Sequence, residues 1–588
     1  MPNALLVYPE FPPSYWGYNF ALDFVGKKSS MPPLGLLTVA GMFPQEYQLK
    51  LVDMNVTPLS DADLAWADFV FTSTMIVQKN SLQEVISRCN RAGVPIIAGG
   101  PHPTSFYEEI EGVDHFVLNE VEDIFAEFLQ DLKNGAAKHV YRSSKRPDIT
   151  RTPLPRYDLI DVRNYGSMAL QFSRGCPFNC EFCDITKLLG RIPRTKTNGQ
   201  VLAEFNVLYE AGWRGPLFLV DDNFIGNKKK AMQLLPEVAR WQKERNYPFY
   251  LYTEASVNLA EMEPLMDAMV EAGFNMAFLG IETPNPEALL KTNKSQNTKK
   301  GADNYLLNAV RKIQKKGLEV CAGFILGLDG DREDVFDAQI QFIQEAGIPL
   351  AMVGLLTALK GTDLYDRLQR EGRMLEESTG NNVSIDLNFK PEMDRQTLIE
   401  GYKRVLSTLY DPGLKNYFER CLVFLKHLKP IENNVRGVGK TELMALARSI
   451  KRQLFSRQGP AYLRFLAKII KDHPRVFPEA VRLAIMGYHF EKVTSQQIAV
   501  DNFKQYLEIE FNAFKEKVSI FAKAQSSRMA EIAACAQELF ARVHTQYEHI
   551  HKDFRYSVQD ALDIFQESVR SYLDQLIGPI PIEIKSFS

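Results

Sequence analysis

Short hydrophobic runs alternate with longer amphipathic stretches through the first two thirds of this sequence. The runs have the length of strands, and the stretches between them space hydrophobic residues three and four positions apart, as in a helix with one buried face. Strands that alternate with helices form parallel sheets. For the first third we predict a doubly wound α/β sheet, with strands at Ala4–Val7, Gln48–Asp53, Asp68–Thr72, Val94–Ala98 and Asp114–Leu118, and helices at Leu34–Phe43, Leu82–Arg91 and Val121–Leu132.

The middle of the chain repeats the same rhythm. Helical spacing is clear at Lys228–Arg245 and Glu261–Ala272. Six strand-and-helix units suit a partial (β/α)6 barrel of the TIM type. The predicted strands are Met168–Phe172, Leu217–Val220, Phe249–Thr253, Met276–Ile281, Leu318–Leu326 and Met352–Leu356.

Strand patterns stop near Lys390, and helical patterns follow, for example at Arg395–Tyr410, Lys440–Arg457 and Ala461–Lys471. The run from Asn502 to Leu576 is amphipathic without a clear heptad. Packing on the core or pairing with a second chain as a homodimer is favoured for it over peripheral contact with a membrane. The predicted domains are the doubly wound domain at 1–144, a Pro-containing linker at 145–165, the barrel at 166–389 and an α-helical domain at 390–588.

Composition narrows the class of protein. A formal net charge of −3 gives no reason to expect a nucleic-acid-binding surface, and 45% hydrophobic with 24% charged residues is typical of a soluble globular protein. No apolar run approaches the roughly 20 residues of a transmembrane helix. Cys89, Cys321, Cys421 and Cys535 stand singly on apolar segments, so we expect core thiols and a reducing cytoplasm. The first residues lack a basic region, and we expect no signal peptide.

The other three cysteines, Cys176, Cys180 and Cys183, fall within eight residues directly after the strand Met168–Phe172. Three thiolates on one loop can bind three irons of a [4Fe–4S] cluster. They leave one iron with an open position, as catalytic metal sites do. Three cysteines can neither complete an all-cysteine zinc site nor all pair as disulfides. Buried, incidental cysteines are the alternative.

This C-x3-C-x2-C loop, with the aromatic Phe182 before its last cysteine, resembles the signature of the radical S-adenosylmethionine (SAM) enzymes. The resemblance implies that the open iron chelates the amino and carboxylate groups of SAM. It also implies reductive cleavage of SAM to a 5′-deoxyadenosyl radical, with the electron supplied by a reductant such as flavodoxin or ferredoxin.

Polar residues and glycines follow successive strands of the predicted barrel. Barrel enzymes bind ligands at this end of their strands; a solvated loop carboxylate or a turn glycine is the alternative for each residue. The resemblance places Asp222 or Asn223 near the amino group of SAM, Glu282 near its ribose or methionine end, and the segment from Gly323 to Gly327 along its adenine. Glu254 is expected at SAM or at the substrate.

Loops at the strand ends of the first third carry a second set of candidates, which are Asp53, Thr72, Ser73, Gly99, Gly100, His102, Thr104 and Glu120. Glycine lets a backbone approach a ligand closely, although a plain turn explains Gly99-Gly100 equally well. Together with Met31–Leu36 these loops resemble a cobalamin-binding domain. The motif D-x-H-x-x-G is absent from the sequence, so we expect no histidine from that motif on cobalt. His102 is expected to bond backbone or a corrin amide.

The order of cobalamin domain, radical SAM barrel and helical tail resembles the cobalamin-dependent radical SAM methyltransferases, with the arrangement of hopanoid C-2 methylase. The resemblance implies methyl transfer through methylcobalamin to an unactivated carbon of a small-molecule or lipid-like substrate. Two alternatives stay open at this point. One is a cyclase or rearrangement enzyme with the same cofactors, and the other is an iron–sulfur or cobalamin sensor without enzymatic activity.

Overall fold

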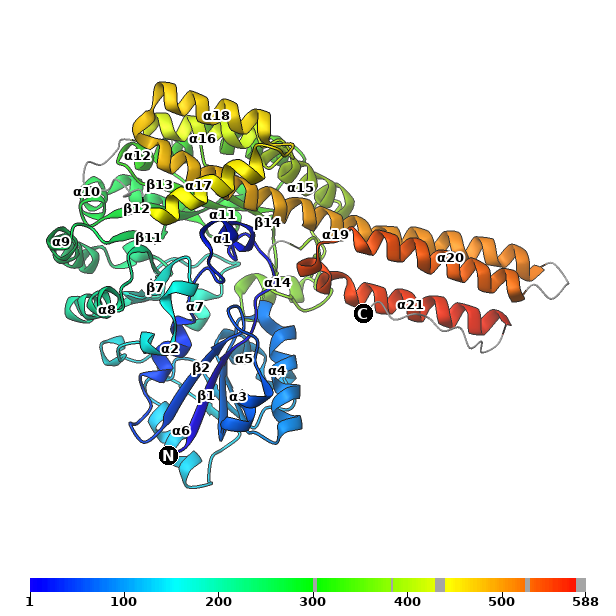
Figure 1. Ribbon diagram of the computed structural model, residues 1–588, viewed down its shortest axis with the longest axis horizontal. Helices are drawn as coiled ribbons and strands as arrows, with labels where there is room; N and C mark the ends of the chain where they lie inside the picture. Colours follow the sequence, from blue (N-terminus) through cyan, green and yellow to red (C-terminus); the bar gives the residue numbers. More distant parts are fainter. Residues whose placement is uncertain (300–303, 382–383, 429–438, 524–528, 578–588) are drawn as a thin grey trace. The chain divides into compact units, whose positions relative to one another are not determined.

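The computed structural model describes residues 1–299, 304–381, 384–428, 439–523 and 529–577 (Figure 1). The chain forms two compact units, Met1–Glu491 and Lys492–Ser588. The first contains both sheets and the helices up to the start of the long helix α19 (Phe477–Lys523).

The first sheet has six parallel strands in the order β2-β1-β3-β4-β5-β6. They are β1 (Asn3–Tyr8), β2 (Gln48–Asp53), β3 (Phe69–Ser73), β4 (Ile96–Gly99), β5 (His115–Leu118) and β6 (Val140–Arg142). Val7 of β1 pairs with Val52 on one side and with Thr72 on the other, so the strands end level. The chain reverses its winding between β1 and β3, and doubly wound sheets bind ligands beyond the carboxyl ends of the strands at such a point.

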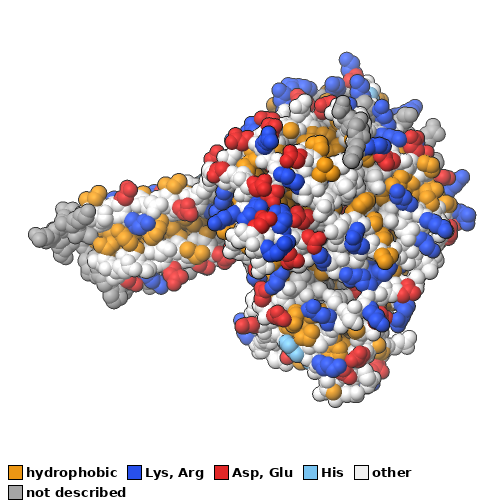
Figure 2. Space-filling view, turned by 180° about the vertical axis from the view of Figure 1, so that it is seen from behind, with side chains coloured by type: hydrophobic (Ala, Val, Ile, Leu, Met, Phe, Trp, Pro, Cys, Tyr) orange, Lys and Arg blue, Asp and Glu red, His pale blue; other side chains and the backbone are white. Residues whose placement is uncertain are grey.

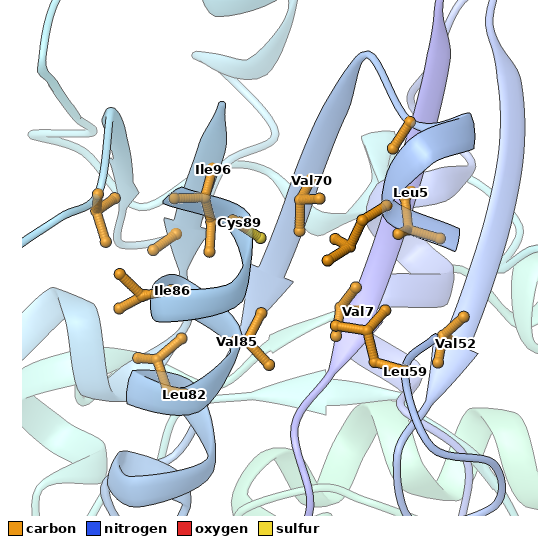
Figure 3. Close-up of a cluster of buried hydrophobic side chains, with 14 of the residues drawn as sticks. Leu5, Val7, Val52, Leu59, Val70, Leu82, Val85, Ile86, Cys89 and Ile96 are labelled. Carbon is orange, nitrogen blue, oxygen red and sulfur yellow. The ribbon is translucent and has the colours of Figure 1, made fainter. Parts of the chain in front are cut away.

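Helices cover both faces of this sheet because its strands are apolar on both sides. Figure 3 shows one face, where Leu82, Val85 and Cys89 of α4 (Lys79–Ala92) pack against Val7 and Val70 of the sheet. The helix α3 (Asp61–Trp66) lies on the same face. The helices α2 (Leu34–Ala40) and α6 (Phe125–Lys133) cover the other face, around a group of phenylalanine rings.

The second sheet is also parallel throughout, with the order β14-β13-β12-β11-β10-β7. Its strands are β7 (Met168–Leu170), β10 (Gly215–Leu219), β11 (Phe249–Ala255), β12 (Phe274–Glu282), β13 (Glu319–Leu326) and β14 (Ala351–Leu355). The helices of this region are α8 (Asn198–Glu210), α9 (Lys228–Glu244), α10 (Glu263–Glu271), α11 (Pro286–Lys291), α12 (Tyr305–Lys315), α13 (Val335–Ala346) and α14 (Asp363–Arg370). Each strand pairs with the next in chain order, which is the topology of the predicted partial barrel. The predicted fold class is confirmed.

Helices past residue 390 complete the first unit. The helices α15 (Arg395–Leu409) and α16 (Lys415–His427) pack on α13 of the barrel. The hydroxyl of Tyr410, which comes directly after α15, donates to the carbonyl of Ala351 at 2.7 Å and accepts from its N–H at 3.0 Å. The helix α17 (Lys440–Gln453) packs on α1 (Asn19–Val25), and α18 (Gly459–Asp472) packs on α16.

The second unit is built from the end of α19, α20 (Met529–Glu548) and α21 (Tyr556–Ile577). Each of these helices contributes buried residues, for example Phe514 of α19, Leu539 of α20 and Phe565 of α21. Ion pairs link Lys517 to Glu538 and Arg542 to Glu510 across the unit. The amphipathic faces predicted from Asn502 to Leu576 therefore pack on one another within the described part of this unit. Among the described residues, no helix is long and apolar enough to cross a membrane.

Candidate functional site

The three cysteines lie on the loop after β8 (Ser173–Arg174) and are free thiols. Cys180 is buried, and Cys176 and Cys183 are half-buried. Burial raises the pKa of Cys176 and raises that of Cys183 to about 12. Because a thiol must lose its proton to bind iron, loading a cluster here releases protons. Among the described residues no three His, Cys, Asp or Glu side chains converge on a single-ion site. A cubane cluster has a different requirement, since each thiolate binds its own iron.

Backbone contacts set the shape of this loop. Gly175 has φ +96°, and a Cβ there would lie 2.7 Å from the carbonyl oxygen of Gly190. That same carbonyl accepts the N–H of Cys176 at 3.1 Å. The loop is also held at Glu181, whose N–H donates to the carbonyl of Thr292 at 3.0 Å and whose carboxylate pairs with Arg367. A glycine is therefore required directly before the first cysteine.

Two carboxylates after β10 hold the start of the loop. Asp221 accepts the N–H of Phe172 at 2.8 Å and the hydroxyl of Ser173 at 2.6 Å. Asp222 accepts the N–H of Gly175 at 2.7 Å. Burial raises the pKa of Asp221 to about 7 and that of Asp222 to about 6. Asp222 is one of the two residues predicted near the amino group of SAM, and one of its oxygens anchors the cysteine loop.

Two side-chain amides direct their N–H groups at the sulfur atoms. Nδ2 of Asn223 lies 3.8 Å from Sγ of Cys176, and Nε2 of Gln296 lies 3.4 Å from Sγ of Cys180. Such donors stabilise thiolate charge and tune a cluster. The acceptor oxygens of both amides are buried without a partner among the described residues. A ligand with N–H or O–H groups would satisfy them, and SAM carries both, so the donor set fits the cluster and the orphaned acceptors fit SAM.

A buried ion pair lies beside this loop. Glu282 is the last residue of β12 and has φ +65°, and its Oε1 lies 2.6 Å from Nζ of Lys294. Burial alone would lower the pKa of Lys294, but Glu282 and the neighbouring thiols of Cys180 and Cys183 raise it. Lys294 is therefore a permanent cation near the cysteines. Glu282, predicted at the ribose or methionine end of SAM, has one oxygen on this lysine.

Glu254 occupies the corresponding end of β11 and pairs in register with Phe278 of β12. Its carboxyl has no hydrogen-bond donor among the described residues, and its electrostatic neighbours are Asp221, Asp222 and Lys294. Burial, reinforced by the two aspartates, raises its pKa to about 8. A half-buried carboxyl with a raised pKa and no hydrogen-bond donor among the described residues, near the carboxyl end of a barrel strand, is a candidate for contact with a ligand.

Neighbouring side chains explain why glycine is needed at Gly323 of β13 and at Gly327 in the loop after it. A Cβ at Gly323 would lie 3.0 Å from the ring of Phe278, and one at Gly327, where φ is +87°, would lie 2.8 Å from Leu398. The predicted contact of this segment with adenine stays a prediction.

The candidates of the first sheet fall into two groups. Thr72, Ser73, Gly99, Gly100, His102 and Thr104 gather at the carboxyl ends of β3 and β4, while Asp53 and Glu120 bond elsewhere. In the first group, Oγ1 of Thr72 and Nδ1 of His102 are buried without a partner among the described residues, as is Oγ1 of the neighbouring Thr74. Orphaned polar atoms at the carboxyl ends of parallel strands suit an amide-rich ligand such as cobalamin. Burial lowers the pKa of His102 to about 4, so its ring is neutral near pH 7.

The paired glycines serve the sheet itself. A Cβ at Gly100, where φ is +92°, would lie 2.5 Å from Oγ of Ser73, and one at Gly99 would lie 2.8 Å from the carbonyl oxygen of Val117. Thr104, on the short helix α5 (Pro101–Phe106), accepts the N–H of Asn119 at 3.0 Å. These glycines allow neighbouring strands to end close together, whether or not a ligand also approaches them.

Asp53 and Glu120 link the first sheet to residues 165–194. Asp53 accepts the hydroxyl of Tyr165 at 3.0 Å and the N–H of Asn55 at 3.0 Å. Glu120 pairs with Arg174 at 2.9 Å and with Arg194 at 2.8 Å. Both carboxylates are buried.

Sequence reasoning missed Lys294, Gln296 and Ser256. Lys294 and Gln296 stand in the polar run 292–297 after α11, and Ser256, whose hydroxyl accepts from Nδ2 of Asn223 at 3.2 Å, directly succeeds β11. A signal was present, because a polar run without periodicity beside the fourth barrel strand marks a loop near the strand ends. Nothing in it showed which side chains would turn toward the cysteines.

Three family models match this chain. The radical SAM superfamily matches residues 170–343, a B12 binding domain matches 27–129, and a domain of unknown function matches 362–501. The first match begins just before the cysteine loop, and the second spans the first-sheet candidates.

Curated relatives extend over most of the chain. An uncharacterised methyltransferase of Synechocystis sp. is 42% identical over 514 residues, which are 86% of this chain and 95% of the relative. Hopanoid C-2 methylase of Rhodopseudomonas palustris is 35% identical over 422 residues, which are 71% of this chain and 78% of the relative.

Solved structures share the fold. The cobalamin-dependent SAM radical enzyme OxsB, with aqua-cobalamin bound, aligns with a TM-score of 0.55 at 13% identity, over 98% of this chain and 84% of that one. The radical SAM methyltransferase TsrM of Kitasatospora setae, with cobalamin and a [4Fe–4S] cluster bound, aligns with a TM-score of 0.51 at 14% identity, over 82% of this chain and 99% of that one.

Proposed function

Because this chain belongs to the cobalamin-dependent radical SAM methyltransferases, the family of hopanoid C-2 methylase, we propose that it transfers a methyl group to an unactivated carbon of a lipid-like small molecule. The observation that carries the proposal is identity of 35–42% to methyltransferases across both the B12-binding and the radical SAM regions. A sensor without enzymatic activity, and a rearrangement without net methyl transfer, are not favoured by these relatives.

The cofactors are a [4Fe–4S] cluster, SAM and cobalamin. When bound, they supply the reductive cleavage of SAM and the carriage of the methyl group. We propose Cys176, Cys180 and Cys183 as the cluster ligands. Their loop is fastened by backbone contacts to Asp222, Gly190 and Thr292, so the protein positions the thiolates before any metal arrives.

For SAM we propose contacts with Asp222, Asn223, Glu254 and Glu282 and with the segment from Gly323 to Gly327. An acceptor-rich lining supports this assignment, because SAM carries a sulfonium, an ammonium and two ribose hydroxyls. Asn223 offers a buried oxygen without a partner in the described structure, and Glu254 offers a whole carboxyl. Binding the positive ligand would hold Glu254 ionised and so lower its pKa from about 8.

For cobalamin we propose Asp53, Thr72, Ser73, Gly99, Gly100, His102, Thr104 and Glu120. Thr72 and His102 have the strongest support, since both bring an orphaned polar atom to the carboxyl ends of β3 and β4. Asp53 and Glu120 have less, because Tyr165 and two arginines already bond them. A cytoplasmic location, a flavodoxin- or ferredoxin-type reductant, a homodimer through the C-terminal helices, and the division into domains at 144, 165 and 389 are further proposals.

Two measurements test this function. Anaerobically reconstituted protein with SAM and a strong reductant should form both 5′-deoxyadenosine and S-adenosylhomocysteine, because one SAM is cleaved and another donates its methyl group. Lipid extracts of cells with and without the gene should differ by the mass of one CH2 group on one compound. Formation of 5′-deoxyadenosine alone, with no methylated product from deuterated-methyl SAM, would count against methyl transfer.

A further inference from the structure

Exposed hydrophobic side chains concentrate on α17, α18 and the turn between them. Of the seventeen large hydrophobic side chains that the described residues expose, six lie between Lys440 and Asp472. They are Leu443, Met444, Ile450, Phe455, Leu463 and Ile470. Phe455, in the turn, is 86% exposed. Scattered single residues of this kind are ordinary on a surface, but a cluster on two adjoining helices is not.

These residues form a second apolar face, separate from the one each helix buries. On α18, Tyr462, Phe465 and Ile469 are buried toward the protein, while Leu463, Ala467 and Ile470 lie along one line of the exposed side at the spacing i, i+4, i+7. Leu443, Ala447 and Ile450 repeat that spacing on the exposed side of α17. No described residue covers either line of exposed side chains.

A basic line runs beside the apolar line of α18. Arg464, Lys468 and Lys471 each stand one position after Leu463, Ala467 and Ile470. From Lys440 to Asp472 there are eight basic and two acidic residues, in a chain whose net charge is −3. Figure 2 shows Lys and Arg side chains along the upper margin of the first unit, at the height of α18 in Figure 1, with hydrophobic side chains below them.

Most of these cations have no ion pair within the part of the chain that the structure describes. Arg448 and Arg452 bond α1 through the backbone and side chain of Asp23. Lys451, Arg457, Arg464, Lys468 and Lys471 have no ion pair with any described residue, whereas the barrel surface pairs many of its lysines, as Lys299 with Glu261 and Lys316 with Asp267. Unpaired cations beside exposed apolar residues match the two layers of an anionic membrane surface, which are acidic headgroups above acyl chains.

We propose that the exposed face of α17 and α18 docks this protein on anionic lipid membranes. A lipid interface explains the apolar line and the basic line together, whereas a nucleic acid would leave Leu463, Ile470 and Phe455 without a role. Membrane docking would bring the enzyme to the proposed lipid-like substrate, and its biological purpose rests on that proposed function. Membrane binding itself does not depend on methyl transfer. It also places membrane contact on α17 and α18, and not on the run from Asn502 to Leu576, where the sequence pattern alone left it as an alternative.

Sedimentation of the full-length protein with vesicles tests this proposal. Protein should sediment with vesicles of phosphatidylcholine and phosphatidylglycerol, and much less with phosphatidylcholine alone or at high salt, because exposed charges are screened. The double variant Arg464→Glu/Lys468→Glu should lower the partition coefficient about tenfold or more, since each basic residue near an anionic surface is worth about a factor of five. Leu463→Ser/Ile470→Ser should also lower it about tenfold or more, because binding at a membrane interface scales with the apolar area that is buried there.

A matched control is available in the second unit. Ile509 and Ile520 are 65% and 68% exposed, so Ile509→Ser/Ile520→Ser removes as much exposed apolar surface elsewhere and should bind like the wild type. Thermal unfolding of each variant shows that it is folded. Wild-type protein that stays in the supernatant, or a charge-reversed variant that sediments normally, would overturn the proposal. So would light scattering that shows a wild-type dimer turned into a monomer by both α18 variants, because the face would then join two copies of the chain.

Discussion

Glu120, the second residue after β5, places its carboxylate 2.9 Å from the guanidinium of Arg174, two residues before the first cysteine of the loop. The same carboxylate lies 2.8 Å from Arg194, and Glu122 lies 2.6 Å from Arg174. All four side chains are largely buried. The sheet that we propose for cobalamin is therefore bonded directly to Arg174 of β8, which leads into the cysteine loop, and to Arg194, which follows it.

Glu120→Ala should destabilise the cofactor-free protein by about 3–5 kcal/mol, because it leaves two buried arginines with less counter-charge. Urea unfolding under anaerobic conditions measures this loss. The exposed pair of Arg151 and Asp123, at 2.6 Å near the same end of the first sheet, provides the control. Asp123→Ala should cost less than about 1 kcal/mol. Equal effects of the two substitutions would show that the Glu120 contacts are ordinary surface pairs.

Replacing Cys176, Cys180 or Cys183 by Ala should remove the cluster and all SAM cleavage, because each thiolate is proposed to bind one iron. Iron and sulfide analysis after reconstitution measures the loss. Cys89→Ala is the matched control, since Cys89 is a buried thiol on α4 and should leave iron content unchanged. Iron near four atoms per chain in the triple Ala variant would contradict the assignment.

Lys294→Met should lower the reduction potential of the cluster, because it removes a buried cation from beside Cys180 and Cys183. A unit charge several ångströms away is worth a few kcal/mol at an effective dielectric constant of about 20, so a decrease on the order of 50–100 mV is expected. Redox titration with detection by electron paramagnetic resonance measures it without substrate. Lys291→Met, which removes an exposed lysine paired with Glu287 one helical turn earlier, should leave the potential within a few millivolts of the wild type. An unchanged potential in Lys294→Met would remove this lysine from the surroundings of the cluster.

The cofactor-free protein should lose stability as pH rises from about 5 to 8, because the folded state keeps Glu254 protonated up to a pKa of about 8 and the unfolded chain does not. Asp221 and Asp222, with pKa values raised to about 7 and about 6, contribute in the same direction. Glu254→Gln removes the carboxyl with the most strongly raised pKa of the three. It should therefore stabilise the folded protein at pH 8 by about 1–2 kcal/mol, but hardly at pH 5. Melting curves at both pH values measure this. Glu210→Gln, on the exposed end of α8, should show no such difference, and a Glu254 variant that behaves like it would mean that the carboxyl is hydrated.

Periodicity was enough to predict both sheets. Every predicted strand of the two sheets is present within a few residues, because buried parallel strands are near-continuous apolar runs. The short edge strand β6 was not predicted, since Val140–Arg142 lies in a charged stretch and pairs with β5 alone. The helix α5 also lies where a loop was predicted, because Pro101 after Gly100 is equally typical of a turn and of a helix start.

The site was less predictable, and the reason is long-range contact. The cysteine spacing is local and carries its own chemistry. Glu120 meets Arg174 across 54 positions, and Gln296 meets Cys180 across 116, so no local pattern distinguishes these side chains from solvated ones. The sequence pattern predicts a ligand contact for Gly99 and Gly100. Paired glycines look the same in sequence whether they allow neighbouring strands to end close together or allow a ligand to approach.

His102 should not bind cobalt through nitrogen. Its backbone N–H donates to the carbonyl of Thr74 at 2.9 Å in the first turn of α5, its ring lies against Phe106, and its Nδ1 is buried without a partner among the described residues. We therefore expect a hydrogen bond to a corrin amide. The cob(II)alamin form of protein labelled with ¹⁵N-histidine should give the same electron paramagnetic resonance spectrum as unlabelled protein, because an axial histidine would change its nitrogen splitting on labelling. A spectrum that changes with the label, and loses that splitting in His102→Ala, would place this histidine on the metal. His115→Ala is the control, since the ring of that partly exposed residue bonds the carbonyl of Lys138 and is not among the cobalamin candidates.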